Sequence, residues 1–98
     1  MFGMFRNTIA FNRELNGWGT KVGKVKNMCG MFAGATSFNQ DLSEWDVGNV
    51  MDMRNMFYFA TSFNQDLSRW SVSNVTKTEG MFNGATSFNR DRIGWNVT

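Results

Sequence analysis

The chain has 98 residues, including ten Phe and eight Met, but no His, no Pro and a single Cys. The missing His excludes a Ser-His-Asp triad, a Cys-His pair and a His/Cys zinc site, and one Cys cannot form a disulfide within the chain. The formal net charge of +2 is too small to indicate a nucleic-acid partner. We expect no membrane span, because no apolar run approaches the roughly 18 residues that one requires. We also see no signal peptide.

A segment of 25 residues recurs along the chain. The copies begin with Met-Phe at Met4, Met31, Met56 and Met81, and the first copy carries two extra residues near positions 19–21. Units of this size cannot bury an apolar face alone, so we expect them to stack as one domain. The predicted units are 1–27, 28–52, 53–77 and a truncated 78–98. The aligned columns are Phe11/Phe38/Phe63/Phe88, Asn12/Asn39/Asn64/Asn89 and Trp18/Trp45/Trp70/Trp95.

Each unit is predicted to begin with a short helix or a helical turn. Its apolar residues recur at the spacing of one helical face. Between the second and third units these residues are Val50, Met53, Met56, Phe57 and Ala60. Ser73 is placed to cap the start of the equivalent segment that follows. Gly34 and Gly84 suit the left-handed residue that ends it.

An extended segment follows the bend in each unit. Phe38 and Leu42 lie on one face of this segment, which predicts a short strand that ends near the Trp. We expect the strands of successive units to pair in a narrow parallel sheet, about 4.8 Å apart. In the last unit Arg92 replaces the Leu, so that strand is expected to slip or bulge. The predicted fold class is therefore an α/β repeat solenoid of about four coils.

Charged residues support this register, because stacking makes residues 25 positions apart neighbours. Four such pairs combine opposite charges: Glu44 with Arg69, Asp52 with Lys77, Arg54 with Glu79 and, after the insertion, Lys21 with Asp46. Each pair contributes roughly 0.2–1 kcal/mol. One column stacks like charges instead, at Glu14, Asp41, Asp66 and Asp91. These carboxylates either are solvated and accept hydrogen bonds from turn amides, or form a cation-binding ladder.

The repeated pattern M-F-x-G-A-T-S-F-N-Q-D-L-S-x-W-x-V-x-N-V-x-x-M covers the whole chain. It resembles the BspA-like, leucine-rich-type repeats of bacterial surface proteins, in the form common in mycoplasma lipoproteins and other host-associated bacteria. The resemblance implies a leucine-rich-repeat-like solenoid in secreted or surface-exposed proteins that act in adhesion and host interaction. It implies no catalytic site. It also places this chain at the cell surface or outside the cell, as part of a longer protein.

Two surfaces are candidates for interaction. Tyr58 and Phe59 occupy columns that hold small or polar residues in the other units. We expect the pair to be exposed, where it forms either a contact or a lid over neighbouring units. Gln40, Gln65 and Arg90 lie beside the predicted strands and form a second candidate face.

Cys29 shares its column with Arg54 and Glu79, so we expect it to be at least partly exposed. An exposed thiol leaves a disulfide crosslink between chains open, against the alternative of an ordinary packed thiol. The first unit is the most basic, with five Lys and Arg against one Glu, so an anionic partner would bind there first.

These observations favour a non-enzymatic binding module with a protein or glycan partner, which the resemblance indicates to be host-derived. The alternative is a structural, self-assembling element, because both chain ends fall inside a unit and carry no polar cap. An enzyme is the least favoured class, since a filled stack rarely offers a carboxylate cleft. We therefore predict no catalytic residue, no cofactor, no metal and no nucleic-acid partner.

Overall fold

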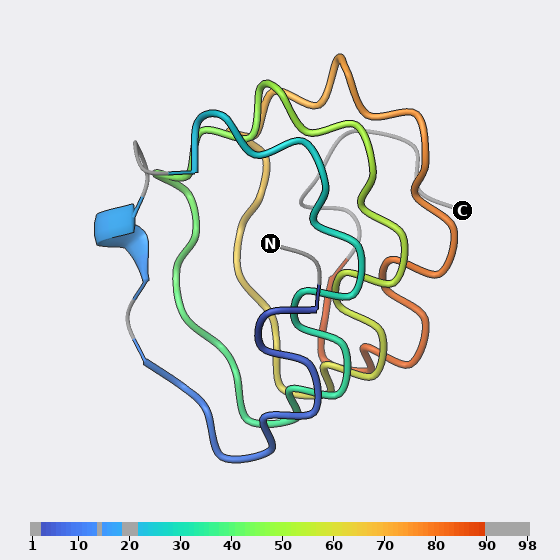
Figure 1. The fold of residues 1–98 in the computed structure, drawn as a ribbon. Coiled ribbons are helices and arrows are strands. Elements are labelled where there is room, and N and C mark those ends of the chain that lie inside the picture. The colour runs from blue at the N-terminus through green and yellow to red at the C-terminus, as the bar shows by residue number, and fades with distance from the viewer. Residues whose placement is uncertain (1–2, 14, 19–21, 90–98) are drawn as a thin grey trace.

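Turns, rather than helices and strands, make up almost all of this fold. The computed structural model describes residues 3–13, 15–18 and 22–89 (Figure 1). Within these ranges the one regular element is a three-residue 3-10 helix, η1 (Asn16–Trp18). Two isolated parallel β-bridges join Asn27 to Asp52 and Asp52 to Lys77, without forming a strand or a sheet in the described ranges. The predicted α/β, leucine-rich-repeat-like solenoid is therefore wrong, and the chain forms a compact body of 29 × 27 × 21 Å.

The hydrogen bonds of segment 53–60 show why the predicted helix is absent. The amides of Met56 and Ala60 donate to the carbonyls of Met53 and Phe57, three residues back, at 3.2 and 3.0 Å. The amide of Phe57 instead donates to the carbonyl of Met81, in the next unit, at 2.9 Å. An α-helix would keep all of these amides within the segment. Here they alternate between a local turn and the neighbouring unit.

Left-handed backbone also interrupts these segments. Asn55 and Phe59 have φ angles of 57° and 53°, and Gly30 and Gly34 have 67° and 72°. A left-handed residue every four positions is incompatible with a right-handed helix. Gly34 and Gly84 are left-handed as predicted, but they end single turns and not helices.

The extended segments after each bend do not pair as predicted. In place of a backbone ladder, the side-chain oxygen of an Asn in one unit accepts a hydrogen bond from a backbone amide of the next unit. The Asn39 amide donates to Asn12 Oδ1 at 2.8 Å, and the Asn64 amide donates to Asn39 Oδ1 at 2.9 Å. The two β-bridges lie elsewhere in the unit, at the column of Asp52. The predicted sheet is therefore replaced by side-chain bridges.

Successive units lie side by side. Their turn segments, at residues 3–7, 29–34, 54–59 and 79–84, form a row of neighbouring zigzags from dark blue to orange-red (Figure 1). The amide of Gly34 donates to the carbonyl of Tyr58 at 2.7 Å, and Phe59 donates to Asn83 at 2.8 Å. Each amide thus reaches the unit that follows its own in sequence.

Two rows of stacked Phe rings form the core. Phe5, Phe32, Phe57 and Phe82 stack with 5.4 Å between neighbouring centroids. Phe11, Phe38, Phe63 and Phe88 form the second row, at 5.7 to 5.9 Å. These spacings approach the roughly 4.8 Å between hydrogen-bonded chains, so a flat ring can stack at every junction. Met28, Met31, Met53, Met56 and Met81 are fully buried beside these rings, whereas Met4 and Met51 are exposed.

Candidate interaction surface

Tyr58 and Phe59 form an exposed aromatic pair on the turn of the third unit. They are 37% and 47% exposed, and their rings meet edge to face with centroids 4.6 Å apart. The φ of 53° at Phe59 is rare for a bulky residue. The other units have Asn7, Gly34 and Gly84 at this position. The exposed fractions of Tyr58 and Phe59 confirm the predicted exposure of the pair.

Phe59 also covers the unit that follows. A Cβ atom on Gly84 would lie 2.6 Å from Cδ1 of Phe59, so the ring rests directly on the Gly84 backbone. The same arrangement recurs where Asn7 Oδ1 rests on Gly34. Phe59 therefore forms a lid over the neighbouring unit, which was one of the two predicted alternatives. Nearly half of its surface still faces solvent.

The Gln residues of the second predicted face bridge neighbouring units. Gln40 Nε2 donates to the carbonyl and to Oδ1 of Asn12, both at 3.1 Å. Gln65 Nε2 makes the same two contacts to Asn39, at 3.1 and 3.0 Å. Both side-chain amides therefore serve the contact between units. Arg90, the third predicted member, lies outside the described residues.

Gln65, but not Gln40, also lines a hollow in the surface. Its lining consists of Asp41, Ser43, Glu44, Gln65, Asp66 and Arg69. Asp41 and Asp66 each accept the amide two residues ahead, at 2.9 and 2.8 Å, which confirms the prediction that they bond to turn amides. Glu44 lies 3.6 Å from Arg69, so this predicted charge pair is confirmed. Within the described ranges no three His, Cys, Asp or Glu side chains are grouped as a metal site would require.

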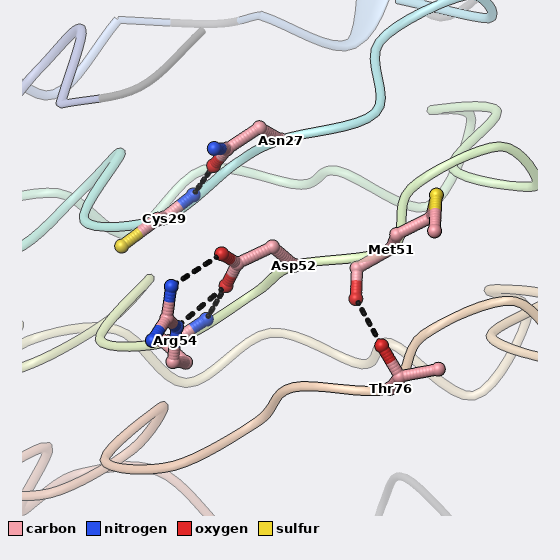
Figure 2. Close-up of polar contacts among 6 residues, drawn as sticks. All are labelled: Asn27, Cys29, Met51, Asp52, Arg54 and Thr76. Atoms are coloured by element: carbon pink, nitrogen blue, oxygen red, sulfur yellow. Dashed lines mark hydrogen bonds and ion pairs between the residues drawn. The ribbon is translucent and has the colours of Figure 1, made fainter.

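Figure 2 shows a charge cluster that the sequence analysis missed. Asp52 is only 8% exposed, and its Oδ2 lies 2.9 Å from Arg54 Nη2. Its Oδ1 accepts the backbone amide of Arg54 at 3.0 Å and Nε at 3.1 Å. Hydrogen bonds from Arg54 hold the pKa of Asp52 below its ordinary value, against the opposing effect of burial. Asp52 in turn raises the pKa of Arg54.

Asp52 and Lys77 are neighbours in adjacent units, as the register predicts, but the cluster changes how two of the predicted charge pairs interact. Arg54 bonds to Asp52 of its own segment, so among the described residues the pairs Asp52–Lys77 and Arg54–Glu79 do not form ion pairs. Lys77 acts on Asp52 through weaker, longer-range attraction. Lys21, the predicted partner of Asp46, lies outside the described residues.

A spacing signal could have revealed the cluster. An Asn or Asp side chain often accepts the backbone amide two residues ahead. Asn27 Oδ1 accepts the amide of Cys29 in this way at 2.8 Å, one unit before Asp52 and Arg54 (Figure 2). Cys29 is partly exposed as predicted, and a disulfide crosslink through it remains a prediction.

The inner residues of the Trp column belong to the core. Trp45 and Trp70 are buried, and their indole nitrogens donate to the carbonyls of Leu15 and Leu42 at 2.8 and 2.9 Å. Trp95 lies outside the described residues.

These features define a repeat protein whose units are joined by turn amides, stacked rings and Asn side chains. The chain belongs to the family described as Mycoplasma protein of unknown function, DUF285, whose model matches residues 1–98. Comparisons with curated proteins and with solved structures gave no match. None of the described residues form a helix of the length and apolarity that crossing a membrane requires.

Proposed function

We propose that this chain is a non-enzymatic binding module of a bacterial surface or secreted protein, and that Tyr58 and Phe59 contact a protein or glycan partner from a host. The observation that carries the proposal is an exposed aromatic side chain on a left-handed residue. The resemblance to BspA-like surface repeats supports the location and the adhesive role. The family match to Mycoplasma proteins is consistent with a bacterial source.

Phe59 carries two costs that a glycine would avoid. A left-handed conformation costs an L-residue about 1–2 kcal/mol. In addition, nearly half of the ring remains in water. Backbone strain of this kind concentrates at functional sites, and exposed aromatic residues are enriched where proteins bind partners. Tyr58 extends the same surface with a second ring and a hydroxyl. The pair therefore offers apolar faces to aliphatic side chains or to the CH groups of a sugar.

The Phe59→Gly variant tests this function, because it restores the residue found in two other units. We expect wild-type protein to bind at least one member of a glycan array or of a panel of purified extracellular-matrix glycoproteins. Phe59→Gly should weaken that binding about tenfold or more, as loss of a central aromatic contact does. Its free energy of unfolding should be unchanged or higher, because the glycine removes strain.

Met51→Ala provides the control, since Met51 is another exposed large apolar side chain that lies outside the pair. It should bind like the wild type. Full binding by Phe59→Gly, or no binding by the wild type to either panel, would contradict the proposal. An antibody against residues 1–98 should also label intact, unpermeabilised cells of the source bacterium.

A further inference from the structure

The exposed cation Arg6 lies beside the surface that carries Tyr58 and Phe59. Arg6 belongs to the first unit, but its side chain extends over the second, because a Cβ atom on Gly30 would lie 3.9 Å from Nη1 of Arg6. The turn that contains Gly30 is bonded to the third unit, where the amide of Gly34 donates to the carbonyl of Tyr58 at 2.7 Å. The guanidinium therefore lies over the unit directly next to the aromatic pair.

Arg6 and Tyr58 belong to one surface column, with Ala33 between them and Asn83 after them. Arg6, Tyr58 and Asn83 are exposed, whereas Ala33 is only 2% exposed. The small side chain of Ala33 is thus covered by the longer ones on either side of it. Tyr58 has a described unit on each side, so its exposure is a property of the column within the row of units.

The charge of Arg6 is not neutralised by its surroundings. In the four turn segments the cations are Arg6 and Arg54, and the one carboxylate is Glu79. Arg54 bonds to Asp52, and Glu79 acts on Arg54 from the fourth unit. Arg6 forms no ion pair with any described residue. Its guanidinium therefore offers a planar set of N–H donors near the two exposed rings.

This combination of groups indicates the chemistry of a ligand. A guanidinium binds a carboxylate through two parallel hydrogen bonds, and aromatic rings pack against the CH groups of a sugar. A peptide is commonly bound along a free strand edge or in a groove. The described residues form no strand, and the segment between Arg6 and Tyr58 carries the small residues Ala33 and Gly34. The surface therefore favours a sugar with a carboxylate over a peptide.

We propose that the partner is an acidic glycan, an inference that rests on the proposed binding function. A sugar carboxylate binds the guanidinium of Arg6, while the glycan packs its CH groups on Tyr58 and Phe59. Adjacent units are 5.4 Å apart at the core rings, which is comparable to the width of a sugar ring, so a short oligosaccharide spans the two contacts. The rings supply apolar contact, and Arg6 selects acidic over neutral glycans.

Matched pairs of oligosaccharides test this selection. The probes contain a uronic or a sialic acid, and each is compared with the same oligosaccharide after reduction of its carboxylate to an alcohol. Reduction should raise the Kd of the wild type about tenfold, because a hydrogen bond to a charged group is lost. Arg6→Gln should raise the Kd for the acidic form by a similar factor. Together the two changes should cost little more than either alone, because both remove the same contact.

Arg13→Gln is the matched control, because Arg13 is another exposed arginine of the first unit and shares its column with Gln40 and Gln65, outside the turn segments. It should bind the acidic form like the wild type. Arg6→Gln should still bind the reduced form like the wild type, and thermal unfolding verifies that it is folded. Phe59→Gly should bind both forms more weakly.

Equal binding of the acidic and reduced forms by the wild type would overturn the proposal. So would equal effects of Arg6→Gln and Arg13→Gln, or tighter binding of a Glu-rich peptide than of any acidic oligosaccharide. No binding of the wild type to any oligosaccharide would also overturn it. Binding of the wild type and of Phe59→Gly to the matrix glycoproteins then decides separately whether Tyr58 and Phe59 form a binding surface.

Discussion

At the scale of single residues, Asp52 connects charge to the contact between units. Its carbonyl accepts the amide of Met28 at 2.9 Å, and isolated bridges link it to Asn27 and Lys77 on either side. Its carboxylate meanwhile holds the guanidinium of Arg54. The backbone of three units and one ion pair therefore meet at a single buried acid.

Asp52→Asn should make stability less dependent on pH. Because Arg54 lowers the pKa of folded Asp52, the carboxylate stabilises the fold above its unfolded pKa, near 3.8. That contribution is lost as the pH falls through the lower, folded value. We therefore expect the variant to have a lower urea midpoint than the wild type at pH 7. The two midpoints should converge only once the pH has fallen below the folded pKa of Asp52, where both side chains are uncharged.

Asp46→Asn is the control for this measurement. Asp46 Oδ1 accepts the amide of Gly48 at 3.0 Å in the same kind of turn, but Asp46 forms no ion pair with any described residue. Its replacement should leave the urea midpoint unchanged at pH 7. If Asp52→Asn behaves like Asp46→Asn, the pairing with Arg54 does not stabilise the fold.

At the scale of elements, the repeat period could be predicted from sequence but the local structure could not. Residues of one column recur every 25 positions, so the stacking of Phe rings and the Glu44–Arg69 contact follow directly from alignment. The apolar spacing from Val50 to Ala60 fits one face of a helix. It fits equally well a chain of turns whose alternate amides bond to the next unit. Apolar spacing carries no information about that hydrogen-bond partner.

For the candidate surface, too, some features could be predicted from the sequence and others could not. The exposure of Tyr58 and Phe59 was predictable, because their columns hold small or polar residues in the other units. The contact of Phe59 with Gly84 was not, because it depends on a left-handed backbone at a residue type that rarely adopts one. The Asp52–Arg54 pair was missed because each residue was matched with the next unit and not with the residue two positions away.

Asn39→Ala should destabilise the fold through loss of a bridge between units. Asn39 Oδ1 accepts the Asn64 amide at 2.9 Å and Gln65 Nε2 at 3.0 Å. A hydrogen bond of this kind contributes about 0.5–1.5 kcal/mol, and we expect a loss of free energy of unfolding in that range. Urea denaturation followed by Trp fluorescence measures it.

Asn39→Asp tests the contribution of the acceptor oxygen alone, because it replaces the amide nitrogen but retains an oxygen at the Oδ1 position. It should keep most of the stability that the alanine variant loses. Equal losses in the two variants would show that the Oδ1 bridges contribute little.

At the scale of the whole molecule, the two Phe rows run through all four units. Phe57 stacks on Phe32 and Phe82, each at 5.4 Å, and contacts Phe63 of the other row at 4.2 Å. An inner ring therefore joins its own unit to both neighbours. Most of the cohesion between units is expected to come from these rings, because burying each one stabilises the fold by about 1.5–3 kcal/mol.

Phe57→Leu should cost about 1–2 kcal/mol of unfolding free energy, because it keeps most of the apolar volume but loses the ring stacking. Phe57→Ala should cost about 3–5 kcal/mol by leaving a cavity. Phe5→Leu is the matched comparison at the end of the row, where the ring is only partly buried. Its loss should be clearly smaller in the same urea titration. Equal losses at positions 5 and 57 would argue against an additive ring row.

Each non-glycine residue with a left-handed backbone places its side chain on a glycine of the next unit. This contact restricts how such an array can evolve by duplication of its units. Phe59 lies on Gly84 and Asn55 lies on Gly80, so the third unit requires a glycine-bearing neighbour after it. A tandem duplication of that unit alone would place one Phe59 ring against the Cβ of another. Copying the third unit together with the glycine-bearing unit that follows it avoids this clash, and so does copying a glycine-bearing unit alone, as Gly30 after Gly3 shows. A duplication of the third unit alone would therefore be selected against, whereas copying it together with the fourth unit would preserve the fit.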